Sequence, residues 1–162
     1  MKKFYRFAIL IFIGLFIFAN TSCSFFGAIG RIFVNVRNGE SPAGENSFIM
    51  SAYLFDASEG VAIDENGNGP QIDRVKAKDL APGQQDYSFS FANPVREGTR
   101  VKVVLCLKTK NTVGSTGQKK YYKAEATFSV QEGVNTPEFP VNQSTGSVFT
   151  EVNVNNAWWY MD

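Results

Sequence analysis

Residues 100–130 read RVKVVLCLKTKNTVGSTGQKKYYKAEATFSV, and this stretch decides the fold class. Before the polar loop at 111–118, one face of an extended run comprises Val101, Val103, Leu105 and Leu107. After the loop, apolar residues again occupy alternate positions, at Tyr122, Ala124, Ala126, Phe128 and Val130. Because successive side chains of a strand point to opposite faces, this period of two predicts an antiparallel β-hairpin.

The same alternation recurs outside this hairpin, and no helix-length window repeats apolar residues at three and four positions. The further expected strands cover 32–37, 48–55, 75–78 and 87–91, with two more near 139–141 and 148–154. Strand 48–55 is apolar on both faces, which favours a central position. Strand 75–78 is interleaved with basic residues, which favours an edge. Seven to nine short strands without a helix predict an all-β fold, a two-sheet antiparallel sandwich.

One part of the chain resembles a known type of sandwich. Residues 80–83 read LAPG, 87–89 read YSF and 98–103 read GTRVKV. This order of turn, aromatic strand, glycine turn and valine-rich strand resembles the immunoglobulin-like and transthyretin-like modules of bacterial surface proteins. The resemblance implies such a β-sandwich for residues 31–162. Cys106 lies in the apolar run of the hairpin and is expected to be a small hydrophobic core residue, with a reactive or intermolecular thiol as the alternative.

The amino terminus, MKKFYRFAILIFIGLFIFANTSC, has the layout of a secretory signal peptide. Three basic residues precede an apolar run of 13 residues at 7–19, and a short polar stretch ends at Cys23. A membrane-spanning helix needs about 20 apolar residues, so the length of this run disfavours a permanent anchor, and an uncleaved signal anchor is the alternative. The sequence therefore predicts a signal peptide at residues 1–22 that is removed from the mature chain.

Residues 20–23, Asn-Thr-Ser-Cys, resemble the lipobox of bacterial lipoproteins, in which a small residue precedes a cysteine. The resemblance implies that Cys23 is acylated on its thiol and becomes the first residue after cleavage. Residues 23–30 would then form a lipidated tether, and the partner would be a membrane. The expected location is the bacterial cell envelope, with the outer membrane or the cell surface favoured over the inner membrane.

Composition argues against most catalytic and nucleic-acid-binding functions. The chain of 162 residues has 16 Lys and Arg, 15 Asp and Glu and no histidine. Without residues 1–22 there are 13 basic residues against 15 acidic ones, which gives no reason to expect binding to nucleic acid. Since histidine is absent, neither a Ser-His-Asp triad nor a Cys-His pair can form. The protein is not expected to be an enzyme.

One loop has the beginning of a calcium-binding pattern. Asp64, Asn66 and Asn68 occupy relative positions 1, 3 and 5, and Gly69 follows at position 6. Position 12, where a bidentate glutamate is required, is Val75, so Asp73 at position 10 would have to substitute. Two interpretations stay open, a calcium site and an ordinary loop rich in Asn and Gly. No other cofactor is expected.

Two further surfaces are candidates for ligand binding. The chain ends in an aromatic group, Trp158, Trp159 and Tyr160, which would form either a sugar- or protein-binding platform or part of the core. The tip of the long hairpin carries Lys108, Lys110, Lys119, Lys120 and Lys123. These lysines would either contact acidic sugars and phospholipid head groups or stay in solvent and discourage edge pairing.

Together these features predict a lipid-anchored, extracytoplasmic, non-catalytic module that binds or assembles with a partner at a bacterial envelope. A carbohydrate-binding module that uses the terminal aromatics is one alternative. A self-assembling structural subunit of the envelope is the other. The expected partner is either a protein or a glycan.

Overall fold

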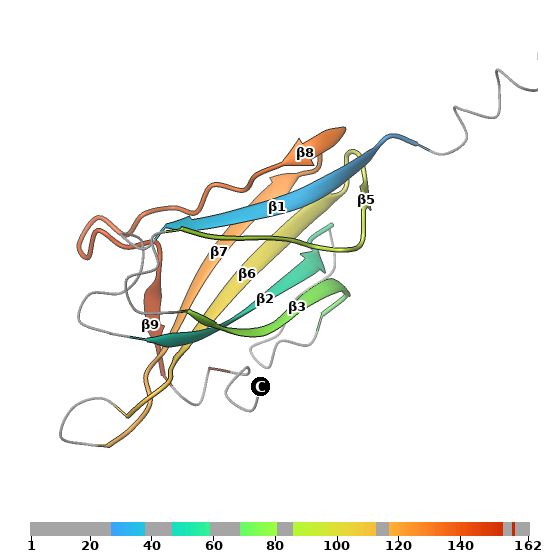
Figure 1. The fold of residues 1–162 in the computed structure, drawn as a ribbon. Helices are drawn as coiled ribbons and strands as arrows, with labels where there is room; N and C mark the ends of the chain where they lie inside the picture. The colour runs from blue at the N-terminus through green and yellow to red at the C-terminus, as the bar shows by residue number, and fades with distance from the viewer. Residues whose placement is uncertain are drawn as a thin grey trace, which may run out of the picture.

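The computed structural model describes residues 27–37, 47–58, 69–80, 86–112, 117–153 and 157. All regular structure among them is β-strand, and the strands form two sheets with a shared core (Figure 1). The nine strands are β1 (Ile29–Arg37), β2 (Phe48–Asp56), β3 (Gln71–Leu80), β4 (Asp86–Ser90), β5 (Val95–Arg96), β6 (Arg100–Thr109), β7 (Tyr121–Ser129), β8 (Gly133–Asn135) and β9 (Thr150–Val152). The predicted all-β, two-sheet sandwich is confirmed.

The larger sheet has the strand order β3-β2-β6-β7-β9. Its centre is the predicted hairpin, in which β6 and β7 pair antiparallel from Arg100 opposite Ser129 to Lys108 opposite Tyr121. Strand β2 lies between β3 and β6 and is buried on both faces, as its two apolar faces predict. Strand β3 is an edge strand, also as predicted, and its Lys76 and Lys78 are exposed.

The smaller sheet is built around β1, which pairs with three strands. The second half of β1 pairs antiparallel with β4, from Phe33 opposite Ser90 to Arg37 opposite Asp86. The first half pairs antiparallel with β5 and parallel with β8. Among the described strands, β1 and β8 form the one parallel pair, and the other pairs are antiparallel. Two- and three-residue strands such as β5 and β8 are too short to produce an alternation that the sequence could reveal.

The main core lies between the two sheets. Ile32, Val34 and Val36 of β1 are 0 to 3% exposed, while the intervening Arg31, Phe33 and Asn35 face outward. The larger sheet contributes Met50, Ala52, Leu54, Val101, Val103, Leu105, Leu107, Tyr122 and Ala124 to the same cluster. Burial of these apolar side chains is the dominant stabilising contribution, at roughly 25 cal/mol per Å² removed from water.

A second apolar cluster lies on the other face of the larger sheet, away from the smaller one. Its buried members are Tyr53, Phe55, Val104, Cys106, Tyr121 and Ala157. Cys106 is 0% exposed, in agreement with its predicted place in the core. The larger sheet is thus covered on both faces, which explains why β2 and β6 carry apolar residues at consecutive positions.

The expected strand at 139–141 is wrong, because these residues have no regular structure. Pro140 has no N–H to donate to a neighbouring strand, and Phe139 contributes to the core by packing against it from an irregular segment. The strand expected at 148–154 is shorter, since β9 covers only Thr150–Val152 and residue 154 lies outside the described part. At the other end of the chain, β1 begins at Ile29, inside the segment that the sequence assigns to the tether.

Candidate functional site

Most of the residues that the sequence singled out lie outside the described residues. This applies to the lipidation candidate Cys23, to the loop residues Asp64, Asn66 and Asn68, and to the terminal aromatics Trp158, Trp159 and Tyr160. Their predicted roles therefore stay predictions. The calcium candidate Asp73, the five lysines of the hairpin tip and the start of β1 can be followed in the structure.

Asp73 connects the two sheets through hydrogen bonds. It lies on β3, where its Oδ2 accepts a hydrogen bond of 2.8 Å from the backbone N–H of Asn93 and its Oδ1 accepts one of 2.7 Å from that of Arg74. The side-chain amide of Asn93 donates in return to the carbonyl of Ile72 at 2.9 Å. Asn93 lies between β4 and β5, so these bonds link an edge of the larger sheet to a connection of the smaller one. Sequence reasoning missed this structural role.

The described residues contain no group of three or more Cys, Asp or Glu side chains that could hold a metal ion. Across the same described part of the chain, no helix is long and apolar enough to cross a membrane. Asp56, at the end of β2, has a carboxyl group with a lowered pKa. Hydrogen bonds from the hydroxyl and the backbone N–H of Ser58 lower the pKa of Asp56 below its usual value of 3.8. The backbone bond measures 2.9 Å and closes a tight local turn.

Three of the five lysines at the hairpin tip form ion pairs with carboxylates. Lys110 pairs with Asp79 at 2.6 Å and Lys120 with Glu151 at 3.6 Å. Lys123 forms an ion pair of 3.3 Å with Glu125. These contacts favour the interpretation of a solvated hairpin end over that of a docking site for acidic ligands.

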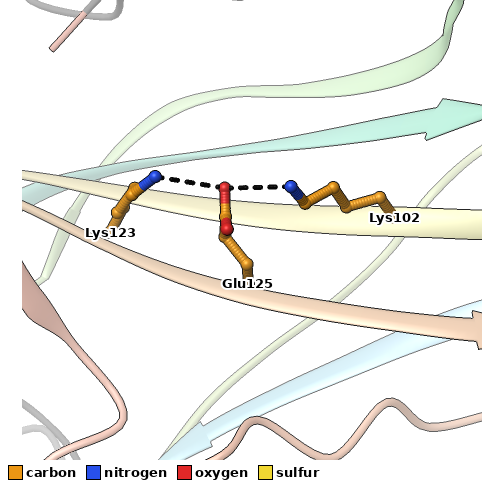
Figure 2. A network of polar contacts seen from close by, with 3 residues as sticks. All are labelled: Lys102, Lys123 and Glu125. Atoms are coloured by element: carbon orange, nitrogen blue, oxygen red, sulfur yellow. Dashed lines mark hydrogen bonds and ion pairs between the residues drawn. The ribbon is translucent and has the colours of Figure 1, made fainter. Parts of the chain in front are cut away.

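Glu125 holds two lysines at once on the face of the larger sheet that carries the second apolar cluster (Figure 2). Lys102 on β6 and Lys123 on β7 both approach its Oε1 at 3.3 Å. Glu125 lies opposite Val104, so Lys102 is its diagonal neighbour across the strand pair, at a distance that long side chains bridge. All three side chains are between 29% and 40% exposed, so these ion pairs are partly exposed to solvent.

The beginning of β1 is held by close packing and by a buried asparagine. Gly30 is buried, and a Cβ atom there would collide with the carbonyl oxygen of Gln131 and with Val130, and would lie 2.6 Å from Nδ2 of Asn135. The Asn135 side chain accepts a hydrogen bond from the Gln131 N–H at 2.8 Å and donates one to the Gln131 carbonyl at 2.8 Å. The Ala28 carbonyl also accepts a bond of 2.7 Å from the Glu97 N–H. The chain is therefore fixed to the fold from its first described residues.

Exposed apolar side chains gather near this beginning of β1. Ile29 is 52% exposed, Phe33 is 38% exposed, and Val134 on β8 is 74% exposed. Two exposed arginines, Arg31 and Arg96, lie among them, because Arg31 is opposite Val134 and Ile29 is opposite Arg96. Neither arginine forms an ion pair within the described part of the chain. We call these five residues the β1–β8 patch; no single sequence motif could have found it, because its members are brought together by strand pairing.

Comparison with known proteins adds no family to this description. No protein-family model matches the sequence, and neither a curated protein nor a solved structure matches it.

Proposed function

We propose that this protein is a lipid-anchored, non-catalytic binding or assembly module on the extracytoplasmic side of a bacterial membrane. The observation that carries the proposal is the short distance along the chain between Cys23 and the first strand. Only six residue steps separate Cys23 from Ile29, where β1 begins. A fully extended chain spans at most about 3.6 Å per residue, so these steps reach roughly 20 Å. An acylated Cys23 would therefore hold a folded sandwich directly against a membrane.

The acyl chains expected on Cys23 would bind strongly enough to keep the protein on a membrane. Each methylene that enters the bilayer contributes about 0.8 kcal/mol, and stable attachment requires two membrane signals, such as two acyl chains. The lipobox resemblance implies at least two acyl chains on Cys23. The sandwich would then need no membrane-crossing element of its own.

Several carboxylates of the sandwich form structural contacts, which makes them poor candidates for catalysis. Asp73 and Asp56 accept structural hydrogen bonds, and Asp79, Glu125 and Glu151 form ion pairs with lysines. General acid–base catalysis needs titratable groups with shifted pKa values in one recess, and a histidine-free chain has few residues for that task.

Metabolic labelling tests the anchor. The full chain is produced in a bacterial host with labelled palmitate, alongside Cys23→Ala and Cys106→Ala variants. We expect label in the wild type and in Cys106→Ala and none in Cys23→Ala, because Cys106 is fully buried in the second cluster. Cys106→Ala is the matched control, since it removes the other cysteine of the chain. Label that survives in Cys23→Ala, or an uncut amino terminus in the mass spectrum, would refute the proposal.

A further inference from the structure

We propose that the β1–β8 patch rests on the surface of the bilayer that holds the lipid anchor, so that the smaller sheet faces the membrane. This inference deepens the proposed function and rests on it. The occupant to which we commit is a phospholipid surface containing anionic head groups. A second copy of the chain is the competing occupant, and the experiments below separate the two.

Strand pairing places the patch on one outer face. The residues of β1 alternate, so Ile29, Arg31 and Phe33 all point away from the core, whereas Ile32 and Val34 point into it. Val134 is the ladder partner of Arg31 and Arg96 that of Ile29, and ladder partners project to the same side of a sheet. Three strands therefore supply apolar side chains and arginines to one continuous area.

The position of the patch matches the reach of the tether. It begins at Ile29, so the roughly 20 Å allowed by six extended residue steps brings it to the bilayer. The lysine-bearing hairpin tip lies at the opposite end of the molecule, as the courses of β1 and β6 in Figure 1 show. The ten residues of β6 separate the two ends by about 33 Å. The patch is thus held close to the membrane, while the tip is not.

The chemistry of the patch suits the boundary between head groups and acyl chains. Exposed Ile, Phe and Val side chains favour transfer out of water, and arginine can bury its stem while its guanidinium contacts phosphate. A Cβ atom at Gly27 would lie 3.7 Å from Cδ of Arg96, so the Arg96 stem runs beside the chain that leads to the anchor. Glu97 and Glu132 are exposed in the turns at this end, so apolar contact rather than net charge should contribute most.

A fluorescent reporter in the lipidated full chain gives the decisive test. Val134→Cys is labelled with a thiol-reactive NBD dye, and the protein is reconstituted into vesicles of phosphatidylethanolamine and phosphatidylglycerol. Val141→Cys is the matched control, because Val141 is also exposed, at 56%, but lies near the hairpin-tip end. That placement follows from the bridge between Asn142 and Ser147 and the pairing of β9 with the start of β7. Acylation blocks Cys23, and Cys106 is 0% exposed, so the dye reports one position.

We expect the dye at position 134 to shift its emission to the blue and to be severalfold less accessible to iodide than the dye at 141. Equal accessibility at the two positions would overturn the inference. A label at 134 that is shielded in the unacylated protein beginning at Ser24, in solution without vesicles, together with a dimer in light scattering, would also overturn it, because a second copy would then cover the patch.

Vesicle binding without the anchor separates this inference from the proposed function. The protein beginning at Ser24 keeps all nine strands and has no acylation site. Its partition onto the same vesicles should fall about tenfold in Val134→Asp and about fivefold in Arg31→Gln, and should not change in Val141→Asp or Lys119→Gln. If all variants partition equally onto the vesicles, the membrane contact of the patch is refuted, even if the labelling experiment shows palmitate on Cys23. If only the patch variants lose vesicle binding but palmitate does not label the full chain, the lipid anchor is refuted and the membrane contact of the patch is supported.

Discussion

Replacing Gly30 with alanine should lower the free energy of unfolding by about 2 kcal/mol, although the change adds only one methyl group. The methyl carbon would collide with the Gln131 carbonyl oxygen and Val130 and lie 2.6 Å from Nδ2 of Asn135. A backbone carbonyl cannot rotate away as the end of a side chain can. β1 must therefore move away from the segment that follows β7.

The magnitude follows from three contributions. Overpacking at a tight contact costs about 1–3 kcal/mol, and weakening an Asn135 hydrogen bond costs about 1 kcal/mol more. Alanine also reduces the entropy of the unfolded chain, which stabilises the fold by about 0.4–1 kcal/mol. For a domain of this size, a net loss near 2 kcal/mol should lower the melting temperature by roughly 6–10 °C.

Two other glycines provide controls for the same substitution. Gly27 makes only ordinary contacts, the nearest being 3.7 Å from Arg96, so Gly27→Ala should be neutral. Gly98 has open space around it but a φ of 81°, so Gly98→Ala should cost about 1–2 kcal/mol through backbone strain alone. Urea unfolding of the protein beginning at Ser24, followed by circular dichroism, measures all three. A Gly30→Ala midpoint equal to that of Gly27→Ala would refute the close-contact argument.

Three further predictions concern polar groups. Asn135→Ala should lower the free energy of unfolding by about 1–3 kcal/mol in the same urea assay, since it leaves the Gln131 N–H unpaired; a neutral effect would contradict this role. Glu125→Gln should cost at most about 1 kcal/mol, and high salt should remove the difference from wild type; a larger, salt-independent loss would mean that the pairs are not exposed. Because the pKa of Asp56 is lowered, its contribution to stability is present above pH 3.8 and is lost as the pH falls through the lowered value. Asp56→Asn should flatten this acid dependence, and an unchanged pH profile would exclude Asp56 as its source.

The fold class was predictable wherever a strand is long and buried on one face or on both. The alternation around Leu105 and Tyr122 revealed the central hairpin, and the charges at Lys76 and Lys78 identified an edge strand. Strands β5 and β8 were missed because two or three residues cannot display a period. Pro140 was compatible with an edge strand as well as with an irregular segment, and the structure shows that its segment is irregular.

The candidate site was harder to predict because long-range pairing creates it. Asn93 and Asp73 are 20 residues apart, and a turn-forming asparagine gives no sign of which carboxylate its backbone will meet. Val134 lies near Ile29 only because β8 pairs parallel with β1, and its partner Arg31 is more than one hundred residues away in the sequence. Cys23 is the opposite case, since its proposed role depends on the adjacent residues and needs no knowledge of the fold.

The pairing of β1 on both sides of its first residues also determines how the molecule would respond to mechanical force. A pull on the amino terminus acts along β1, which is bonded to β5 on one side and to β8 on the other. The hydrogen bonds of these ladders lie across the direction of the load, so they must shear together instead of opening one after another. If the sandwich is attached to a membrane at this end, a force that pulls it away from the membrane would have to break these hydrogen bonds together before β1 could detach.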